Sequence, residues 1–307
     1  MCSFVLGSGL ALISASVGYA MHTYDATIAI VTKDRKDELR RCLGSCVEQS
    51  GRIEILVIDD GSKDDTSAFV TQTYPQVRLI THRDACGLVL RRNEAVSTAS
   101  APVVYHIDDD AWFAHPNIVA QSLSAFTDPD VGAIAINFVN LHEGGKEYFR
   151  YVPERPNVGC FVGTAHAVRR DVFLGLGGYR AEIVRQGEEI DFCLRLFLIG
   201  KTVQVPRTTG QIMHHHSAMR SSSQIRRYAL RNRAVYAYRY GPRWWGVLFL
   251  GYQLMRHLAA YGNANNVRDF FSGANSALRD IWSKDFERVP VPITRLWRFY
   301  TLVRSSR

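Results

Sequence analysis

Short apolar runs alternate with amphipathic helical stretches between residues 26 and 108, and this alternation limits the fold more than any other feature of the sequence. The runs at 26–32, 53–59, 77–81 and 103–108 are typical of buried strands, and the stretches at 34–49, from about Lys63, and at 87–100 are typical of helices. Strands joined through helices imply right-handed crossovers and a mostly parallel sheet. We therefore predict an α/β fold with a mostly parallel mixed sheet flanked by helices.

The rest of the chain continues this pattern and then changes in composition. We predict a strand at 131–141, a hairpin or flap at 142–156, a buried helix at 187–200, a strand at 202–206 and a basic helix at 225–240. Beyond Pro242 the sequence is rich in Trp, Tyr, Arg and Leu. We divide the chain into an N-terminal extension at 1–24, a catalytic domain at 25–240 and a basic aromatic helical tail at 241–307.

The N-terminal extension allows three interpretations. A signal peptide would need a basic start, but no charged residue precedes Asp25. A membrane anchor would need a more consistently apolar run of about 20 residues. The third interpretation is a gene start placed too far upstream, and we take it because a strand begins soon after Met21. The sequence leaves open whether Met1 or Met21 is the initiator.

The net charge of +8 conceals a strong asymmetry. Residues 1–200 contain 19 Lys and Arg against 25 Asp and Glu, a balance of −6, whereas residues 201–307 contain 18 against 4, a balance of +14. Such a split points to an anionic partner for the C-terminal part. The six cysteines show neither a zinc-ribbon spacing nor a disulfide framework, which favours a reducing compartment.

Acidic residues follow three of the predicted strands. Asp34 follows the first, Asp59 and Asp60 the second, and the run from Asp108 to Asp110 the fourth. In "DDGSKDDT" Ser62 could cap a helix, but a cap leaves Asp59 and Asp60 unexplained. Because ligands bind at the carboxyl ends of strands in open α/β sheets, we expect these clusters to converge on one site.

Three consecutive aspartates repel one another, and a divalent cation would relieve that repulsion. Mg²⁺ and Mn²⁺ take carboxylate oxygens and commonly keep positions open for phosphates. On an extended segment Asp108 and Asp110 lie on one side and Asp109 points away. Asp110 is then the direct ligand, and Asp108 reaches a ribose or a water molecule near the metal.

Six segments, in order, resemble family 2 glycosyltransferases of the GT-A fold over residues 26 to 240. They are "TIAIVTKDRKDELRRCLGSC", "EILVIDDGSKDDT", "GLVLRRNEAV", "VVYHIDDDAW", "VGCFVGTAHAVRRDVFLGLGGYR" and "GEEIDFCLRL". The resemblance implies that Asp60 holds the nucleobase and that Asp110 binds Mg²⁺ or Mn²⁺ bridging the diphosphate. The segment "VTKD", ending at Asp34, departs from the Pro-x-Tyr-Asn of the family, which puts stacking on the base in doubt. We assign Asp34, with Asp60, to binding of the nucleotide sugar.

The resemblance also assigns roles to charged residues further along. Glu189 falls on the position of the general base, although both Glu188 and Glu189 could instead only complement the helix dipole. Arg92 is either a phosphate contact or a solvated helix arginine. In "IMHHHS", His214 best matches a metal-binding histidine, while the sequence leaves open which of the three histidines points inward.

Two structural interpretations accompany these roles. Asp191 and Arg195 are predicted to form an i,i+4 pair along one helix. Glycines 159, 163, 177 and 178 flank the presumed acceptor region, where they either let a sugar approach the backbone or serve turns and tight packing.

The sequence thus predicts a metal-dependent, inverting glycosyltransferase of the hexosyl type that acts in polysaccharide biosynthesis. It would move a sugar from a nucleoside-diphosphate sugar to a hydroxyl of a glycan or lipid-linked acceptor, in the cytoplasm. The tail could lie peripherally on an anionic membrane, bind single strands of nucleic acid or simply cap the core. We expect no nucleic-acid partner. A sugar nucleotidyltransferase and a non-catalytic nucleotide-sugar-binding descendant are the alternatives.

Overall fold

The computed structural model describes residues 23–142, 145–149, 151, 157–183, 185–215, 222–261, 264–283 and 286–305. The predictions on residues 1–22, including the choice between Met1 and Met21, therefore lie outside the described residues. The same holds for parts of the 142–156 segment.

The first half of the chain forms the predicted parallel strands. They are β1 (Ala26–Thr32), β2 (Ile53–Asp59), β3 (Arg78–Thr81) and β4 (Val103–Asp108), connected through α1 (Lys36–Val47), α2 (Thr66–Thr73) and α3 (Leu88–Thr98). In the register, Thr32 pairs with Asp59 and Val31 pairs with Asp108. The carboxyl ends of β1, β2 and β4 therefore lie level at one edge, as the acidic strand ends predicted.

The second half of the chain extends this sheet with strands of both directions. The order is β3-β2-β1-β4-β10-β6-β11-β9, in which β10 (Ala165–Arg169) runs antiparallel between β4 and β6 (Val131–Ala135). The remaining strands are β11 (Thr202–Gln204) and β9 (Asn157–Val158), and the helices of this half are α4 (Ile118–Leu123), α5 (Arg170–Gly175) and α6 (Glu188–Leu198). The prediction of a mostly parallel mixed sheet is confirmed.

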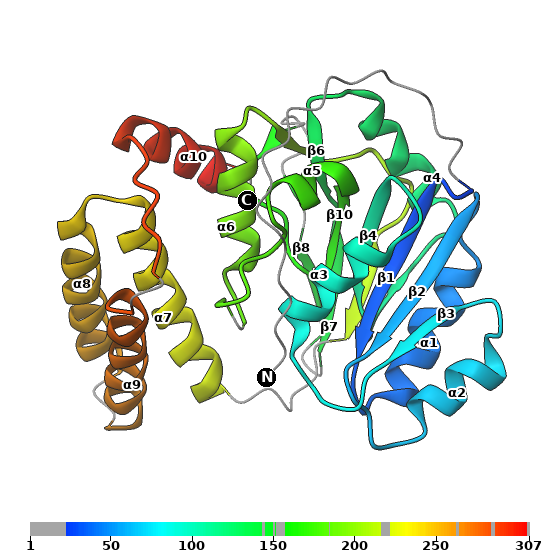
Figure 1. The fold of residues 1–307 in the computed structure, drawn as a ribbon, viewed down its shortest axis with the longest axis horizontal. Helices are drawn as coiled ribbons and strands as arrows, with labels where there is room; N and C mark the ends of the chain where they lie inside the picture. Colours follow the sequence, from blue (N-terminus) through cyan, green and yellow to red (C-terminus); the bar gives the residue numbers. More distant parts are fainter. Residues whose placement is uncertain are drawn as a thin grey trace.

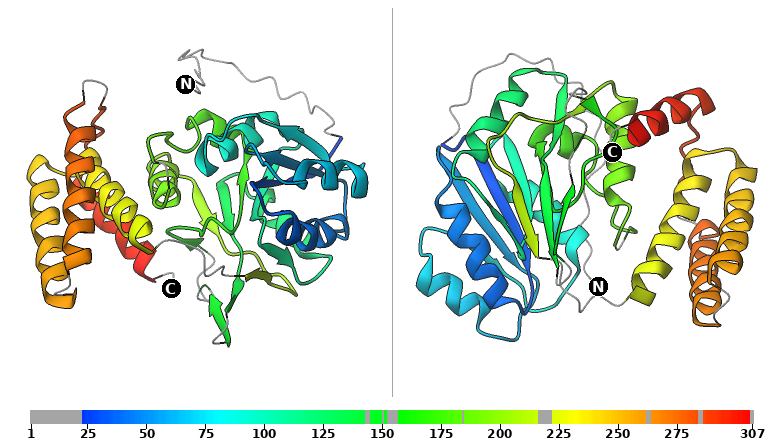
Figure 2. Two further views of the ribbon diagram at one scale, coloured as in Figure 1. Left: turned by 90° about the horizontal axis from the view of Figure 1, so that it is seen from below. Right: turned by 180° about the vertical axis from the view of Figure 1, so that it is seen from behind.

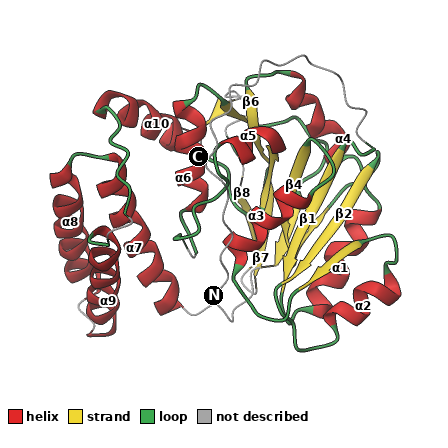
Figure 3. Cartoon of the chain, viewed as in Figure 1, coloured by secondary structure: helices red, strands yellow, loops and turns green. Residues whose placement is uncertain are grey.

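Helices cover both faces of the large sheet (Figures 1 and 3). Side chains alternate along a strand, so in β1 Ile28 and Ile30 face α1, α2 and α4, whereas Ala29 faces α3, α5 and α6. The buried face of α1 is made of Leu39, Cys42, Leu43 and Cys46, as its spacing predicts. Two apolar layers therefore hold the strand ends rigidly in place.

The chain also forms a second, smaller sheet, and this sheet shows that one prediction is wrong. Its order is β5-β12-β7-β8, formed by β5 (Ala111–Phe113), β12 (Ile212–His215), β7 (Phe138–His142) and β8 (Gly145–Phe149). The single strand predicted at 131–141 is wrong, because the chain leaves the large sheet after Ala135. Asn137 makes the change of sheet: its carbonyl accepts from Ile212 N at 3.1 Å and its Oδ1 accepts from Tyr151 N at 2.9 Å. The hairpin predicted at 142–156 begins earlier than expected, since β7 and β8 pair antiparallel across 138–149, and residues 150 and 152–156 lie outside the described residues.

The C-terminal part is helical. Helices α7 (Ser222–Tyr240), α8 (Arg243–Tyr261) and α9 (Ala264–Ile281) pack on one another, and α10 (Ile293–Ser305) returns to α6 and β9 (Figure 2). Gly159 permits this return, since a Cβ there would lie 2.4 Å from Val303 N in α10. None of the described helices is both long and apolar enough to pass through a bilayer.

Candidate active site

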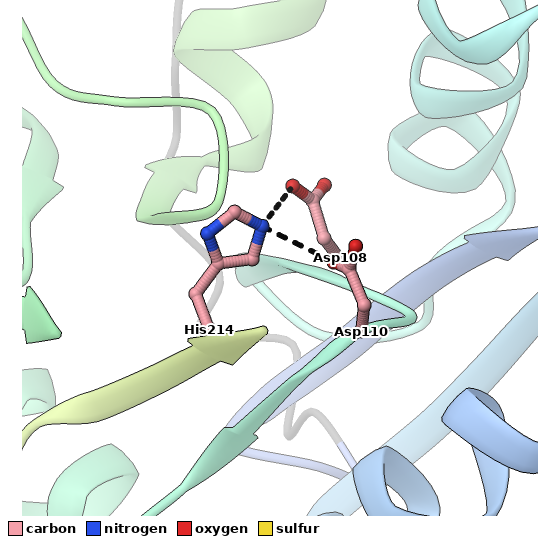
Figure 4. Close-up of side chains that lie close together, drawn as sticks. All are labelled: Asp108, Asp110 and His214. Carbon is pink, nitrogen blue, oxygen red and sulfur yellow. Dashed lines mark ion pairs between the residues drawn. The ribbon is translucent and has the colours of Figure 1, made fainter. Parts of the chain in front are cut away.

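Asp108, Asp110 and His214 converge on one point at the end of β4 (Figure 4). His214 Nε2 lies 3.2 Å from Asp110 Oδ1 and 3.9 Å from Asp108 Oδ2. The small sheet brings them together, because β12 pairs with β5 so that His214 lies opposite Ala111, and His215 N donates to Asp110 O at 2.9 Å. The histidine comes from about a hundred residues further along the chain, yet its position follows from one strand pairing.

Neighbouring side chains orient this cluster. His214 Nδ1 donates to Asn140 Oδ1 at 2.8 Å, which directs Nε2 toward the two aspartates. Arg35 Nη2 donates to Asp110 Oδ2 at 2.9 Å. Burial raises the pKa of Asp110, but His214 and Arg35 outweigh burial and lower it to about 2. Asp110 is therefore ionised throughout the neutral range, as a metal ligand must be.

Asp109 points away from the cluster, as predicted. It accepts hydrogen bonds from Thr32 Oγ1 at 2.8 Å and Arg35 Nη1 at 2.8 Å. Burial raises the pKa of Asp109 to about 7, against the opposing charge of Arg35. Arg35 thus bridges two of the three aspartates and reduces their mutual repulsion.

The donor set of the cluster fits a divalent cation. The ligand atoms of its two carboxylates and one imidazole all lie within 4.8 Å of one another. Carboxylates suit both Mn²⁺ and Mg²⁺, whereas an imidazole nitrogen is a less favourable ligand for Mg²⁺, which prefers oxygen. From the sequence we assigned Asp110 and His214 to the metal and Asp108 to the nucleotide sugar, whereas the structure brings all three side chains together in one cluster. His214 is buried and His215 is exposed, while His216 lies outside the described residues.

Arg92 connects this cluster to the acidic pair at the start of α6. It is buried, not solvated, and its Nη2 donates to Asp108 Oδ1 at 2.7 Å and to Gly163 O at 2.9 Å. Its Nη1 lies 3.8 Å from Glu188 Oε1. A guanidinium with these contacts holds Asp108 in place and brings positive charge between the metal cluster and α6.

The two glutamates of α6 have different surroundings. Glu188 is buried, and burial, with the charge of Glu189, raises its pKa to about 8 although Arg92 acts against this rise. Asp108 and Tyr179 are the other titratable groups that interact with it. Glu189 is half-buried and lines a large cavity. Of the pair, Glu189 is therefore the carboxylate that is accessible from the cavity.

Gly163 lies between Glu189 and Arg92. A Cβ at this position would come 2.6 Å from Glu189 Oε1 and 2.8 Å from Arg92 Nη1. The absence of a side chain is thus required for the carboxylate and the guanidinium to approach each other. Gly177 and Gly178 instead have positive φ angles of 76° and 68° and serve a turn.

Asp60 and Asp34 hold loops at the neighbouring strand ends. Asp60 is buried and accepts from Cys86 N at 2.7 Å, Gly87 N at 2.8 Å and Arg91 Nε at 2.7 Å. Asp34 has a φ of 53° and accepts from Lys63 N at 2.6 Å. Their contact with a nucleotide stays a prediction. The capping role considered for Ser62 is wrong, because its Oγ accepts from Asp34 N at 2.9 Å and the helix begins later, at Thr66.

The cavity that Glu189 lines has a volume of about 690 Å³ and lies between α6, α7, α8 and α10. Of the predicted site residues only Glu189 lines it, so Asp60 and Asp110 do not. The predicted pair of Asp191 and Arg195 is confirmed at 2.9 Å, and Asp191 also lines this cavity. Sequence reasoning missed Arg35, Asn140 and Thr164, whose Oγ1 donates to Asp108 Oδ2.

Comparison with known proteins gives a consistent set of similarities. The sequence profile of glycosyl transferase family 2 matches residues 27–177. An uncharacterized protein of Mycobacterium tuberculosis is 27% identical over 61% of this chain and 66% of its own length. The succinoglycan biosynthesis protein ExoU of Rhizobium meliloti is 24% identical over 61% of this chain and 60% of its own length. The O-antigen biosynthesis protein RfbC of Myxococcus xanthus is 25% identical over 66% of this chain and 18% of its own length. The chain thus spans less than two thirds of the length of each of these relatives.

Two solved structures share the fold at low sequence identity. A mannosyltransferase from Pyrobaculum calidifontis, in complex with GDP-mannose and Mn²⁺, matches with a TM-score of 0.56 and 17% identity, over 93% of this chain and 84% of the other. GalNAc-T7, with UDP, GalNAc and Mn²⁺, matches with a TM-score of 0.60 and 17% identity, over 84% and 55%. These matches confirm the α/β architecture predicted from the sequence.

Proposed function

Since the chain belongs to glycosyltransferase family 2 through residues 27–177, we propose that it transfers a sugar from a nucleoside-diphosphate sugar to an acceptor hydroxyl in polysaccharide biosynthesis. The observation that carries the proposal is the position of Arg92, which donates to Asp108 of the Asp108–Asp110–His214 cluster and lies, like Glu189, against Gly163. This arrangement supports a cation site and a base on either side of one buried guanidinium.

Each residue has a part in this proposal. Asp108, Asp110 and His214 would hold Mn²⁺ or Mg²⁺, which as a Lewis acid stabilises the charge on a departing diphosphate. Arg35 and Asn140 keep the ligands oriented, and Arg92 adds positive charge beside the same point. Asp34 and Asp60 shape the loops that we assign to the nucleotide.

Glu189 is proposed as the general base. It takes the proton of the acceptor hydroxyl while the acceptor oxygen bonds to the anomeric carbon and the bond from that carbon to the diphosphate breaks. This is a single displacement in line with the leaving group, so the proposal includes inversion at the anomeric carbon. Glu189 suits this task because it lines the cavity, whereas Glu188 does not line it and burial raises the pKa of Glu188 to about 8.

We place this reaction at the inner face of a membrane. Helix α8 exposes Trp244, Val247, Leu248, Tyr252 and Met255, with exposures between 54% and 72%, and their spacing puts them on one side of the helix. Residues 201–307 carry an excess of 14 positive charges. An exposed apolar stripe in a strongly basic region suits an anionic lipid surface. The cytoplasmic side is proposed because nucleotide sugars are made in the cytosol.

A thermal-shift panel tests the donor half of the proposal. We expect one of UDP, dTDP, GDP and CMP to raise the melting temperature only when Mn²⁺ is present. His214→Gln should abolish that rise, and His215→Gln, which changes the exposed neighbour, should leave it intact. Equal behaviour of the two variants would refute the metal assignment.

A turnover assay tests the base. Glu189→Gln should retain the Mn²⁺-dependent nucleotide shift and lose sugar transfer, and also donor hydrolysis, by about 10² to 10⁴ fold. Turnover near that of the wild type would show that Glu189 is not the base.

A further inference from the structure

The cavity beside Glu189 has an apolar lining that a sugar-transfer site does not itself require. Its walls include Phe161, Ile190, Val235, Trp245, Phe249 and Leu296. A cavity of about 690 Å³ lies within the usual size range of small-molecule sites. A free glycan would leave its hydroxyls without partners against these walls, at a cost for each unpaired group. The lining therefore suits a hydrocarbon chain.

The same cavity extends from the base to the outer surface of the helical part. Glu189 lies in the first turn of α6, whereas Leu248 lines the cavity from α8, on the far side of α7 (Figure 1). Leu248 is 61% exposed and belongs to the apolar stripe of α8. The stripe and the cavity are therefore continuous, so that a chain could enter from a lipid surface and end near the base.

Two arginines supply charge complementarity for an anionic group. Arg233 in α7 and Arg304 in α10 both line the cavity, both are exposed, and in the described part of the chain neither pairs with a carboxylate. Burial raises the pKa of Tyr300, and the charges of both arginines act against this rise, which places them around one cavity-lining ring. Paired arginines of this kind recognise phosphate oxygens well.

From these observations we infer that the acceptor is lipid-linked: an apolar chain lies in the cavity, its phosphate or diphosphate binds Arg233 and Arg304, and the attached sugar presents its hydroxyl to Glu189. The inference rests on the proposed function, since it names the substrate class for the base at that site. It assigns the C-terminal helices to acceptor binding. Arg239 also lines the cavity, but it is paired with Glu182 at 2.7 Å and has no share in this role.

Binding of dodecyl phosphate below its micelle concentration, followed by tryptophan fluorescence, tests the inference, because Trp245 lines the cavity. We expect saturable binding that Arg233→Gln/Arg304→Gln weakens by about tenfold or more. The control variant Arg243→Gln/Arg298→Gln removes two exposed arginines from α8 and α10 that do not line the cavity, and it should bind as the wild type does. Equal affinity of the two double variants would overturn the inference.

Three further ligands separate the sources of the signal. Inorganic phosphate and dodecanol should each bind at least about tenfold more weakly, since each lacks one half of the proposed ligand. A short-chain phosphatidylglycerol carries its phosphate on a two-chain glycerol lipid; binding as tight as that of dodecyl phosphate would point to bulk membrane lipid and overturn the acceptor assignment. If dodecyl phosphate does not bind as expected but the Mn²⁺-dependent nucleotide shift is intact, only the lipid-linked acceptor is rejected. If the nucleotide shift itself is absent, the proposed function is rejected.

Discussion

Replacing Gly163 by alanine gives the most direct test of how closely Glu189, the proposed base, and the buried Arg92 approach each other around this glycine. The new Cβ would lie 2.6 Å from Glu189 Oε1 and 2.8 Å from Arg92 Nη1, and ordinary contacts of a Cβ begin at 3.4 Å. The two groups must therefore retreat by about 0.8 Å and about 0.6 Å. Both are ends of flexible side chains, so the fold can absorb the change.

The expected effect is on turnover. Misplacing a reacting group by about 1 Å costs on the order of a hundredfold in rate, so we expect kcat to fall about 30- to 100-fold, or about 2 to 3 kcal/mol in the barrier. The assay is Mn²⁺-dependent release of nucleoside diphosphate from the donor identified by the nucleotide panel. The melting temperature should change little.

Gly175→Ala is the matched control. It adds the same methyl group at the exposed end of α5, where nothing lies within 4 Å of the new Cβ. A Gly163→Ala enzyme whose kcat stays within about twofold of this control, with the same metal dependence, would refute the idea that Glu189 and Arg92 act at their observed separation.

Three further changes probe the surroundings of the site. Asn140→Ala should weaken apparent Mn²⁺ affinity about tenfold or more in a thermal-shift titration, since it orients His214; an unchanged titration would remove that role. Glu188→Gln should raise the melting temperature relative to the wild type above about pH 8 and have little effect near pH 4.5. Between these pH values the folded wild type binds more protons than the unfolded chain, so its stability falls as pH rises. A difference in melting temperature that stays constant with pH would contradict this. Glu54→Ala should lower the free energy of unfolding by about 3 kcal/mol in urea titrations, since buried donors lose their acceptor; a loss below about 1 kcal/mol would contradict it.

The sheet and its acidic edge could be predicted because the information is local. Apolar runs of five to seven residues define the strands, and parallel pairing then brings the ends of β1, β2 and β4 to one edge whatever the loops do. Asp108 and Asp110 converge because side chains two residues apart lie on the same side of an extended segment. His214 was within reach of the same reasoning, because three consecutive histidines, which follow a predicted strand and a loop, are unusual.

Other features depend on contacts between distant residues and leave no local signal. The largely apolar run from Val131 to Leu141 contains neither a proline nor a glycine at the point of change, and the single polar residue there, Asn137, does not by itself predict the switch from the large sheet to the small one. Arg35 pairs with Asp109 and Asp110 more than 70 residues away. Arg92 lies on a helix where polar residues usually face water, and only the packed structure buries it.

The helical part also fixes the loop before Glu189, which links the cavity to the catalysis proposed for this residue. Gln186 and Gly187, directly before α6, have φ angles of 63° and 109°, and the former is a conformation that a non-glycine residue rarely adopts. Asn232 of α7 donates to the carbonyls of Arg185 and Gln186, both at 2.6 Å, and so holds the chain in this form. The position of Glu189 thus depends on α7 as much as on the sheet domain, and a ligand that settles between α6 and α7 would bear on the base as well as on the acceptor.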